Sequence, residues 1–206
     1  MLQNIDLTRY IQDAGFDASR YGTAAEDGYY PYIAEYNYRG IAAIINKYAR
    51  KDDDFVDVGS GIGDKLYLAW LTGKFRSISG IEVNPETYYV SKYLLSAHRR
   101  INGHMPYDRG GNSSTFNIHL VDALTVDYSA YSFIYMYHPI QNEKIYSKLI
   151  KRIKETTKDD TIVVEMLHHN LEGVSIVRGH QERVLVAKKV NGNFEALDIP
   201  KGFQLY

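Results

Sequence analysis

An acidic residue followed by alternating glycines is the part of this sequence best suited to bind a ligand. Asp57 is followed by Gly59, Gly61 and Gly63, and a second acidic residue, Glu82, comes later. Glycine has no Cβ, so the main chain can turn sharply there and approach a ligand closely. A helix that begins after such a turn points its unpaired N–H groups and its positive end at the ligand. The pattern therefore predicts a cofactor-binding turn.

Two predicted strands position these acidic residues. Phe55–Val58 has the β-branched and aromatic composition of a short buried strand, and Ser77–Ile81 is a second strand that ends just before Glu82. A helical pattern covers Lys65–Thr72, and Gly73 is suited to end that helix. In an open parallel sheet, ligands bind at the carboxyl ends of the strands. We therefore expect the glycine turn and Glu82 to meet at one edge of a sheet.

The spacing of the glycines distinguishes between cofactors. A dinucleotide fingerprint has the form G-x-G-x-x-G, and its third glycine would fall on Asp64. Gly63 comes one position too early for that fingerprint. The sequence therefore disfavours a nucleotide-dependent oxidoreductase, although that class stays open as an alternative.

Asp57, the three alternating glycines and Glu82 together resemble the motifs of the class I S-adenosylmethionine (SAM)-dependent methyltransferases. The first motif of that family is acidic-x-Gly-x-Gly-x-Gly, and its second is an acidic residue that ends the second strand. The resemblance extends from about residue 54 to the C-terminal strands. It implies SAM as the cofactor and methyl transfer as the activity.

The resemblance also implies a role for individual residues. The main chain from Gly59 to Gly61 would hold the methionine part of SAM, and Asp57 would receive its ammonium group. Glu82 would accept hydrogen bonds from the ribose hydroxyls, and Asp122 with the small Ala123 would contact adenine. The residues expected to bind the cofactor are Asp57, Gly59, Ser60, Gly61, Gly63, Glu82, Val83, Asp122 and Ala123.

The rest of the pattern alternates strands and helices and then ends in strands. A helix within 34–48 precedes the first strand, and Asn84-Pro85-Glu86 opens another helix with a predicted buried stripe of Tyr89, Val90, Tyr93, Leu94 and Ala97. Asn191-Gly192 lies between two strand-like runs, which is a hairpin signal. The further predicted strands are Phe116–Val121, Phe133–Tyr137, Thr161–Glu165, Val174–Val177, Val184–Val190 and Phe194–Asp198, with a helix around Ile145–Ile153.

These elements predict an α/β, Rossmann-like class I methyltransferase fold. We expect a mostly parallel seven-stranded sheet with helices on both faces and a C-terminal antiparallel hairpin. Residues 1–50 would form a helical and aromatic cap segment, and residues 51–206 would form the SAM-binding domain. A polar insertion at residues 104–115 precedes a strand, so it is expected at the edge opposite the ligand.

The acceptor side is marked by Tyr137, His138 and Pro139 at the end of a predicted strand. Family members that methylate amino groups on bases or glutamine often have Asn/Asp-Pro-Pro-aromatic there, and only Pro139 matches. His138 could act as a general base, with Tyr137 beside it as a second candidate catalytic residue. The alternative is that His138 only forms a hydrogen bond at the end of the strand.

His168 and His169 are adjacent, and adjacent side chains of an extended segment point to opposite faces, so we expect no metal site.

Composition limits the function classes further. The 206 residues contain no cysteine, carry a formal net charge of −1 and include 19 tyrosines. We therefore expect no disulfide, no general attraction to nucleic acid, no membrane-spanning segment and a cytoplasmic location.

The acceptor atom would be nitrogen or oxygen, and a likeness to small protein-lysine methyltransferases favours a protein or peptide. A small-molecule or RNA methyltransferase and a non-catalytic SAM-binding module stay open, and the sequence indicates no oligomeric state.

Overall fold

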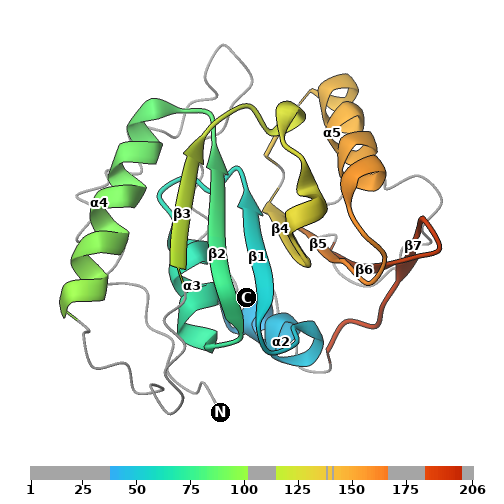
Figure 1. Cartoon of the computed structure of the whole chain (residues 1–206), viewed down its shortest axis with the longest axis horizontal. Helices are drawn as coiled ribbons and strands as arrows, with labels where there is room; N and C mark the ends of the chain where they lie inside the picture. Colours follow the sequence, from blue (N-terminus) through green and yellow to red (C-terminus); the bar gives the residue numbers. More distant parts are fainter. Residues whose placement is uncertain (1–37, 102–114, 138, 141, 167–183, 201–206) are drawn as a thin grey trace.

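The structure is a computed structural model that describes residues 38–101, 115–137, 139–140, 142–166 and 184–200 (Figure 1). For residues 97–101 it describes the backbone only. Its seven-stranded sheet has the order β3-β2-β1-β4-β5-β6-β7. The strands are β1 (Asp53–Val58), β2 (Phe75–Glu82), β3 (Thr115–Leu120), β4 (Phe133–Tyr137), β5 (Ile162–Met166), β6 (Val184–Val190) and β7 (Asn193–Ala196).

Neighbouring strands from β3 to β5 are parallel, whereas β6 pairs antiparallel with β5 and β7 pairs antiparallel with β6. The predicted Rossmann-like fold with a C-terminal antiparallel hairpin is therefore confirmed. Asn191 and Gly192 join β6 to β7 with φ angles of 50° and 78°. Two successive positive φ values define the type I′ turn that their sequence predicts. The predicted strand Val174–Val177 lies outside the described residues.

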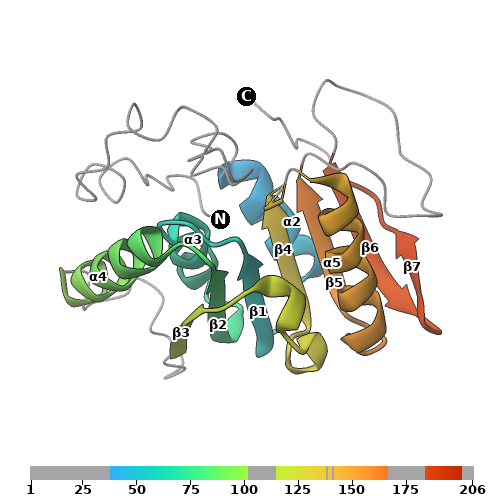
Figure 2. The same ribbon diagram turned by 90° about the horizontal axis from the view of Figure 1, so that it is seen from above.

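Helices cover both faces of the sheet, as Figure 2 shows. The helices α2 (Tyr38–Tyr48), α3 (Asp64–Thr72) and α4 (Pro85–Ile101) share one core cluster with Phe55 of β1 and Tyr135 of β4. The helix α5 (Glu143–Thr156) and the 3-10 turns η2 (Ala123–Thr125) and η3 (Tyr128–Ala130) pack on the opposite face. We call these two sides the α3 face and the α5 face. None of the helices in the described part of the chain is long and apolar enough to cross a membrane.

The helix α3 is buried nearly all round. The reason is α2, which packs against the outer side of α3 with Ile41, Ile44 and Ile45 in the core. The predicted end of α3 is confirmed, because Gly73 adopts the left-handed conformation and its N–H donates to the carbonyl of Trp70.

The expected buried stripe of α4 is wrong in part. Tyr89 and Tyr93 are 65% and 70% exposed, while Leu94 is buried together with Leu95 and Ser91. This helix packs mainly against β2 and β3, at the edge of the sheet, so only a narrow side of it is covered. Small Thr87 and Ser91 side chains turn toward the protein, and the tyrosines face outward.

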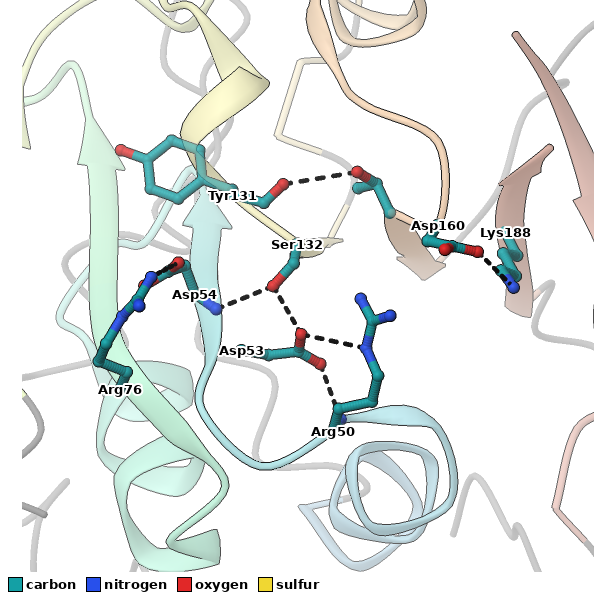
Figure 3. Close-up of polar contacts among 9 residues, drawn as sticks. Arg50, Asp53, Asp54, Arg76, Tyr131, Ser132, Asp160 and Lys188 are labelled. Atoms are coloured by element: carbon teal, nitrogen blue, oxygen red, sulfur yellow. Dashed lines mark hydrogen bonds and ion pairs between the residues drawn. The ribbon is translucent and has the colours of Figure 1, made fainter. Parts of the chain in front are cut away.

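A polar network closes the amino end of the central strands, opposite the predicted ligand edge (Figure 3). Ser132 lies just before β4, and its hydroxyl donates to the carboxylate of Asp53 at 2.8 Å. The same hydroxyl accepts a hydrogen bond from the N–H of Asp54 at 2.9 Å. Arg50 and Arg76 pair with Asp53 and Asp54. These contacts fix the starts of β1, β2 and β4 relative to one another.

Candidate functional site

The glycine turn connects β1 to α3 and is anchored to β2. The N–H groups of Gly59 and Ser60 both donate to the carbonyl of Ile81, at 2.8 and 3.0 Å. The three glycines of the turn, Gly59, Gly61 and Gly63, have φ angles of 77°, 52° and 82°. Residues with a Cβ rarely adopt these angles, which explains why glycine alternates through the turn.

Protein closes one side of this turn and leaves another side open. A Cβ on Gly59 would lie 2.7 Å from Cβ of Pro139, in the segment that follows β4. Among the residues that the structure describes, no heavy atom would lie within 4 Å of a Cβ on Gly61. Both glycines have a positive φ, but their surroundings differ. The space beside Gly61 is therefore where a ligand could reach the main chain.

Glu82 ends β2 and lies against the turn, as the sequence predicts for the second acidic residue. One carboxylate oxygen accepts the N–H of Gly61 at 2.7 Å, and the other accepts the N–H groups of Val83 and Asn84, both at 2.8 Å. A carboxylate oxygen has two lone pairs, so the oxygen bonded to Gly61 can accept one more donor. Sequence reasoning missed the hydrogen bond that joins Glu82 to the turn.

Asp57 occupies the centre of a row of polar residues on the α3 face. In the sheet it lies directly opposite Gly80 on β2 and Tyr135 on β4. The hydroxyl of Ser60 covers Gly80, because a Cβ on Gly80 would lie only 2.6 Å from Ser60 Oγ. The Ser60 hydroxyl, the Asp57 carboxyl group and the Tyr135 side chain therefore cross three adjacent strands in one line.

The residues of this row are buried, and two of their hydroxyls make no hydrogen bond. The exposed fractions are 3% for Ser60, 3% for Asp57 and 1% for Tyr135. Neither the Ser60 nor the Tyr135 hydroxyl has a hydrogen-bond partner in the structure as described. Buried polar side chains are usually paired, so two unpaired hydroxyls beside one carboxyl group need an explanation.

Burial raises the pKa of Asp57 well above its ordinary value. The negative charge of Asp64 raises this pKa further, the Lys65 ammonium opposes the shift, and Glu82 adds to it. Burial also raises the pKa of Tyr135, and the nearby Asp57 and Asp64 charges contribute. Asp57 is thus a carboxyl group that would gain from a cationic partner.

The start of α3 brings further charge to this region. Lys65 pairs with the carboxylate of Asp64, and its ammonium lies 4.8 Å from the centre of the Tyr38 ring. The Tyr38 hydroxyl donates to the same carboxylate at 2.9 Å. Tyr38 belongs to α2, so this cluster ties α2 to the helix that follows the glycine turn.

Asp122 and Ala123 follow β3, beside the end of β2. The Asp122 side chain accepts the N–H of Leu124 at 2.9 Å and so caps the turn η2. The carbonyl of Ala123 accepts the buried hydroxyl of Tyr128 at 2.9 Å. Asp122 therefore has the capping role that any acidic residue after a strand can play, and its contact with adenine stays a prediction.

The acceptor side is only partly described. Tyr137 ends β4 and pairs with Met166 of β5. His138, His168 and His169 lie outside the described residues, as do residues 1–37 of the expected cap segment and residues 104–114 of the expected insertion. Within the described ranges, no group of three or more histidine and acidic side chains could hold a metal ion.

The α5 face carries a buried polar pair that sequence reasoning also missed. Glu165 of β5 and Tyr146 of α5 are 1% and 4% exposed. The Tyr146 hydroxyl donates to the Glu165 carboxylate and lies 3.6 Å from Sδ of Met136. In the sequence, Tyr146 and Glu165 lie within apolar patterns, so only the packing reveals their polar contact.

The comparisons with known proteins support the fold. No protein-family model matches the sequence, and no curated protein is similar to it. An RNA methyltransferase from Salinibacter ruber, solved with S-adenosyl-L-homocysteine, is similar with a TM-score of 0.54 and 17% identity, over 80% of this chain and 95% of that chain. A proposed methylase from Haemophilus influenzae is similar with a TM-score of 0.54 and 8% identity, over 74% and 96%. At such low identity these likenesses establish the fold alone, and it is a Rossmann-like methyltransferase fold.

Proposed function

We propose that this protein is a SAM-dependent methyltransferase that transfers a methyl group to a nitrogen or oxygen acceptor. The observation that carries the proposal is the hydrogen bond between the Gly61 N–H and Glu82, at 2.7 Å. It joins an open glycine turn to an acidic residue on the next strand, at the carboxyl edge of the sheet. The fold shared with the two solved structures supports the same conclusion.

The residues at this edge suit the parts of SAM. Gly61 leaves its main chain open to a ligand, Glu82 retains an acceptor for a ribose hydroxyl, and Asp57 would gain from an ammonium group. SAM itself supplies a methyl group already activated on a cationic sulfur. The protein would bind and align the reactants and exclude water. The S-adenosyl-L-homocysteine bound to the Salinibacter ruber protein supports this choice of cofactor.

The class of acceptor is not assigned. The Salinibacter ruber protein is an RNA methyltransferase, so it gives no support to the protein acceptor that the sequence favoured. RNA, proteins and small molecules all remain candidate acceptors. Tyr137 at the end of β4 is the described residue that we place closest to the acceptor, with His138 as the proposed base.

Ligand-induced stabilisation tests the cofactor. S-Adenosylhomocysteine at 100 times its dissociation constant should raise the free energy of unfolding by about 2.7 kcal/mol, and NAD should not. Thermal unfolding with each ligand measures this difference. Stabilisation by NAD alone would overturn the proposal. Transfer of a labelled methyl group from SAM to fractions of a cell extract would then separate an enzyme from a non-catalytic SAM-binding module.

Substitution of Glu82 tests the site. Glu82→Ala should lower the affinity for S-adenosylhomocysteine at least tenfold, since hydrogen bonds to a charged acceptor are worth about 1.5–3 kcal/mol. Glu82→Gln should have an intermediate effect. The exposed Glu195 on β7 provides a control, and Glu195→Gln should bind like the wild type. Titration calorimetry on the folded variants measures the affinities, and an unchanged affinity in Glu82→Ala would place the cofactor elsewhere.

A further inference from the structure

The two unpaired hydroxyls of the α3 face lie on either side of Asp57. Ser60 covers Gly80, which is the β2 partner of Asp57, and Tyr135 is its β4 partner. Both hydroxyls are buried, and neither has a hydrogen-bond partner in the described structure. A phenylalanine at position 135 would fill the same space without burying an unpaired polar atom. The hydroxyl of Tyr135 is therefore not explained by packing.

The row formed by Ser60, Asp57 and Tyr135 adjoins the glycine turn. One residue separates Asp57 from Gly59, and Ser60 is part of the turn itself. Burial is the main cause of the raised pKa of Tyr135, and the charges of Asp57 and of Asp64, the first residue of α3, raise it further. The register of the sheet places Tyr135 beside Asp57 on the α3 face, next to the proposed cofactor site.

We propose that Tyr135 binds the amino-acid end of the cofactor together with Asp57. An ammonium group has three donors and no acceptor, so it can donate to the Asp57 carboxylate and also to the Tyr135 oxygen. The Tyr135 hydroxyl can at the same time donate its own proton to that carboxylate. Binding would then give the buried Tyr135 hydroxyl a partner and place a cation beside the buried Asp57 carboxyl group. This inference rests on the proposed function and adds a residue that the glycine motif does not contain.

Two ligands that differ only at the amino-acid end test the proposal. S-Adenosylhomocysteine carries the ammonium and carboxylate groups, whereas 5′-methylthioadenosine keeps adenine, ribose and sulfur but lacks them. Tyr135→Phe should weaken binding of S-adenosylhomocysteine about tenfold, because it removes one hydrogen bond to a charged group. Binding of 5′-methylthioadenosine should change less than about twofold. Titration calorimetry on the full chain measures both affinities.

A second buried tyrosine provides the matched control. Tyr146 lies on the α5 face, away from the glycine turn, and its hydroxyl donates to Glu165. Tyr146→Phe should lower the melting temperature and leave the ratio of the two ligand affinities unchanged. Tyr135→Phe should melt at or above the wild-type temperature, because it breaks no hydrogen bond.

The outcomes separate this proposal from the proposed function. If the wild type binds neither ligand, the cofactor assignment and this inference both fall. If the wild type binds both and Tyr135→Phe leaves the ratio of affinities unchanged, only the role of Tyr135 is overturned. Failure of Tyr135→Phe to fold would mean that the hydroxyl has a structural partner, which would also overturn that role.

Discussion

Tyr135 and Tyr146 are both buried against the central strands, on opposite faces of the sheet. On the α5 face the Tyr146 hydroxyl pairs with the Glu165 carboxylate. On the α3 face the Tyr135 hydroxyl has no hydrogen-bond partner in the described part of the chain, although Tyr135 lies in register with Asp57 on the adjacent strand. The α5 face uses its polar groups to hold the structure. On the α3 face, we propose that the Tyr135 hydroxyl and Asp57 serve a ligand instead, and an unpaired buried hydroxyl lowers the stability of the protein without ligand.

The largest effect is expected where the α3 face is packed most closely. Gly80→Ala would place a Cβ 2.6 Å from Ser60 Oγ and 2.8 Å from Leu66 Cδ1. Overpacking of this kind should lower the free energy of unfolding by about 3 kcal/mol. Gly73→Ala is the control, since its Cβ would meet nothing within 4 Å in the described part of the chain, and only its positive φ should cost about 1 kcal/mol.

Denaturant unfolding of these two glycine variants measures the losses. Adding Ser60→Gly to Gly80→Ala should recover part of the stability, because it removes the atom that the new Cβ meets first. Equal losses for Gly80→Ala and Gly73→Ala would contradict the close packing of Ser60 over β2.

The next effect is the difference in stability between the two tyrosine faces. Tyr146→Phe leaves the buried Glu165 carboxylate without its tyrosine donor and should cost about 2 kcal/mol. Tyr135→Phe should either raise the free energy of unfolding or leave it unchanged within about 0.5 kcal/mol. Chemical unfolding of both variants without ligand makes the comparison. A similar loss in both would remove the distinction between the faces.

The pH dependence of stability tests Asp57. Its pKa is raised in the folded protein, so the folded state holds the proton more tightly than the unfolded chain does. The resulting stabilisation is complete below the unfolded pKa of about 4 and is lost as the pH rises toward the folded pKa. Asp57→Asn should therefore gain stability relative to the wild type as the pH rises above about 4. Unfolding without ligand at several pH values measures this gain, and a constant difference would contradict the raised pKa.

The smallest effect is expected at Asp122, an acidic residue that already has a partner. Asp122→Ala removes the cap of η2 and should cost about 0.5 kcal/mol, because the turn is short and the side chain is exposed. If Asp122 also contacts adenine, the affinity for S-adenosylhomocysteine falls as well. Measuring stability and affinity on the same variant decides between a cap alone and a cap that binds the cofactor.

Much of the fold follows from local patterns that depend on few neighbours. The prediction of β4 as Phe133–Tyr137 and of β6 as Val184–Val190 matches the structure at both ends. Gly73 ends α3 and Asn191-Gly192 forms the hairpin turn because the left-handed conformation favours these residue types. The stripe of α4 was wrong because the spacing of its tyrosines fits a helix, but only the edge of the sheet decides which side is covered.

The sequence by itself determined the order of elements and the acidic and glycine positions of the candidate site. Turn chemistry and strand ends are local, so they can be read without a partner. The tertiary structure decided the rest. Only the register of β1 with β2 and β4 brings the Ser60 hydroxyl and Tyr135 to Asp57, and only the packing of the turn on β2 bonds Gly61 to Glu82. Pairing across strands joins residues far apart in the chain, and no local pattern encodes which hydroxyl is left without a partner.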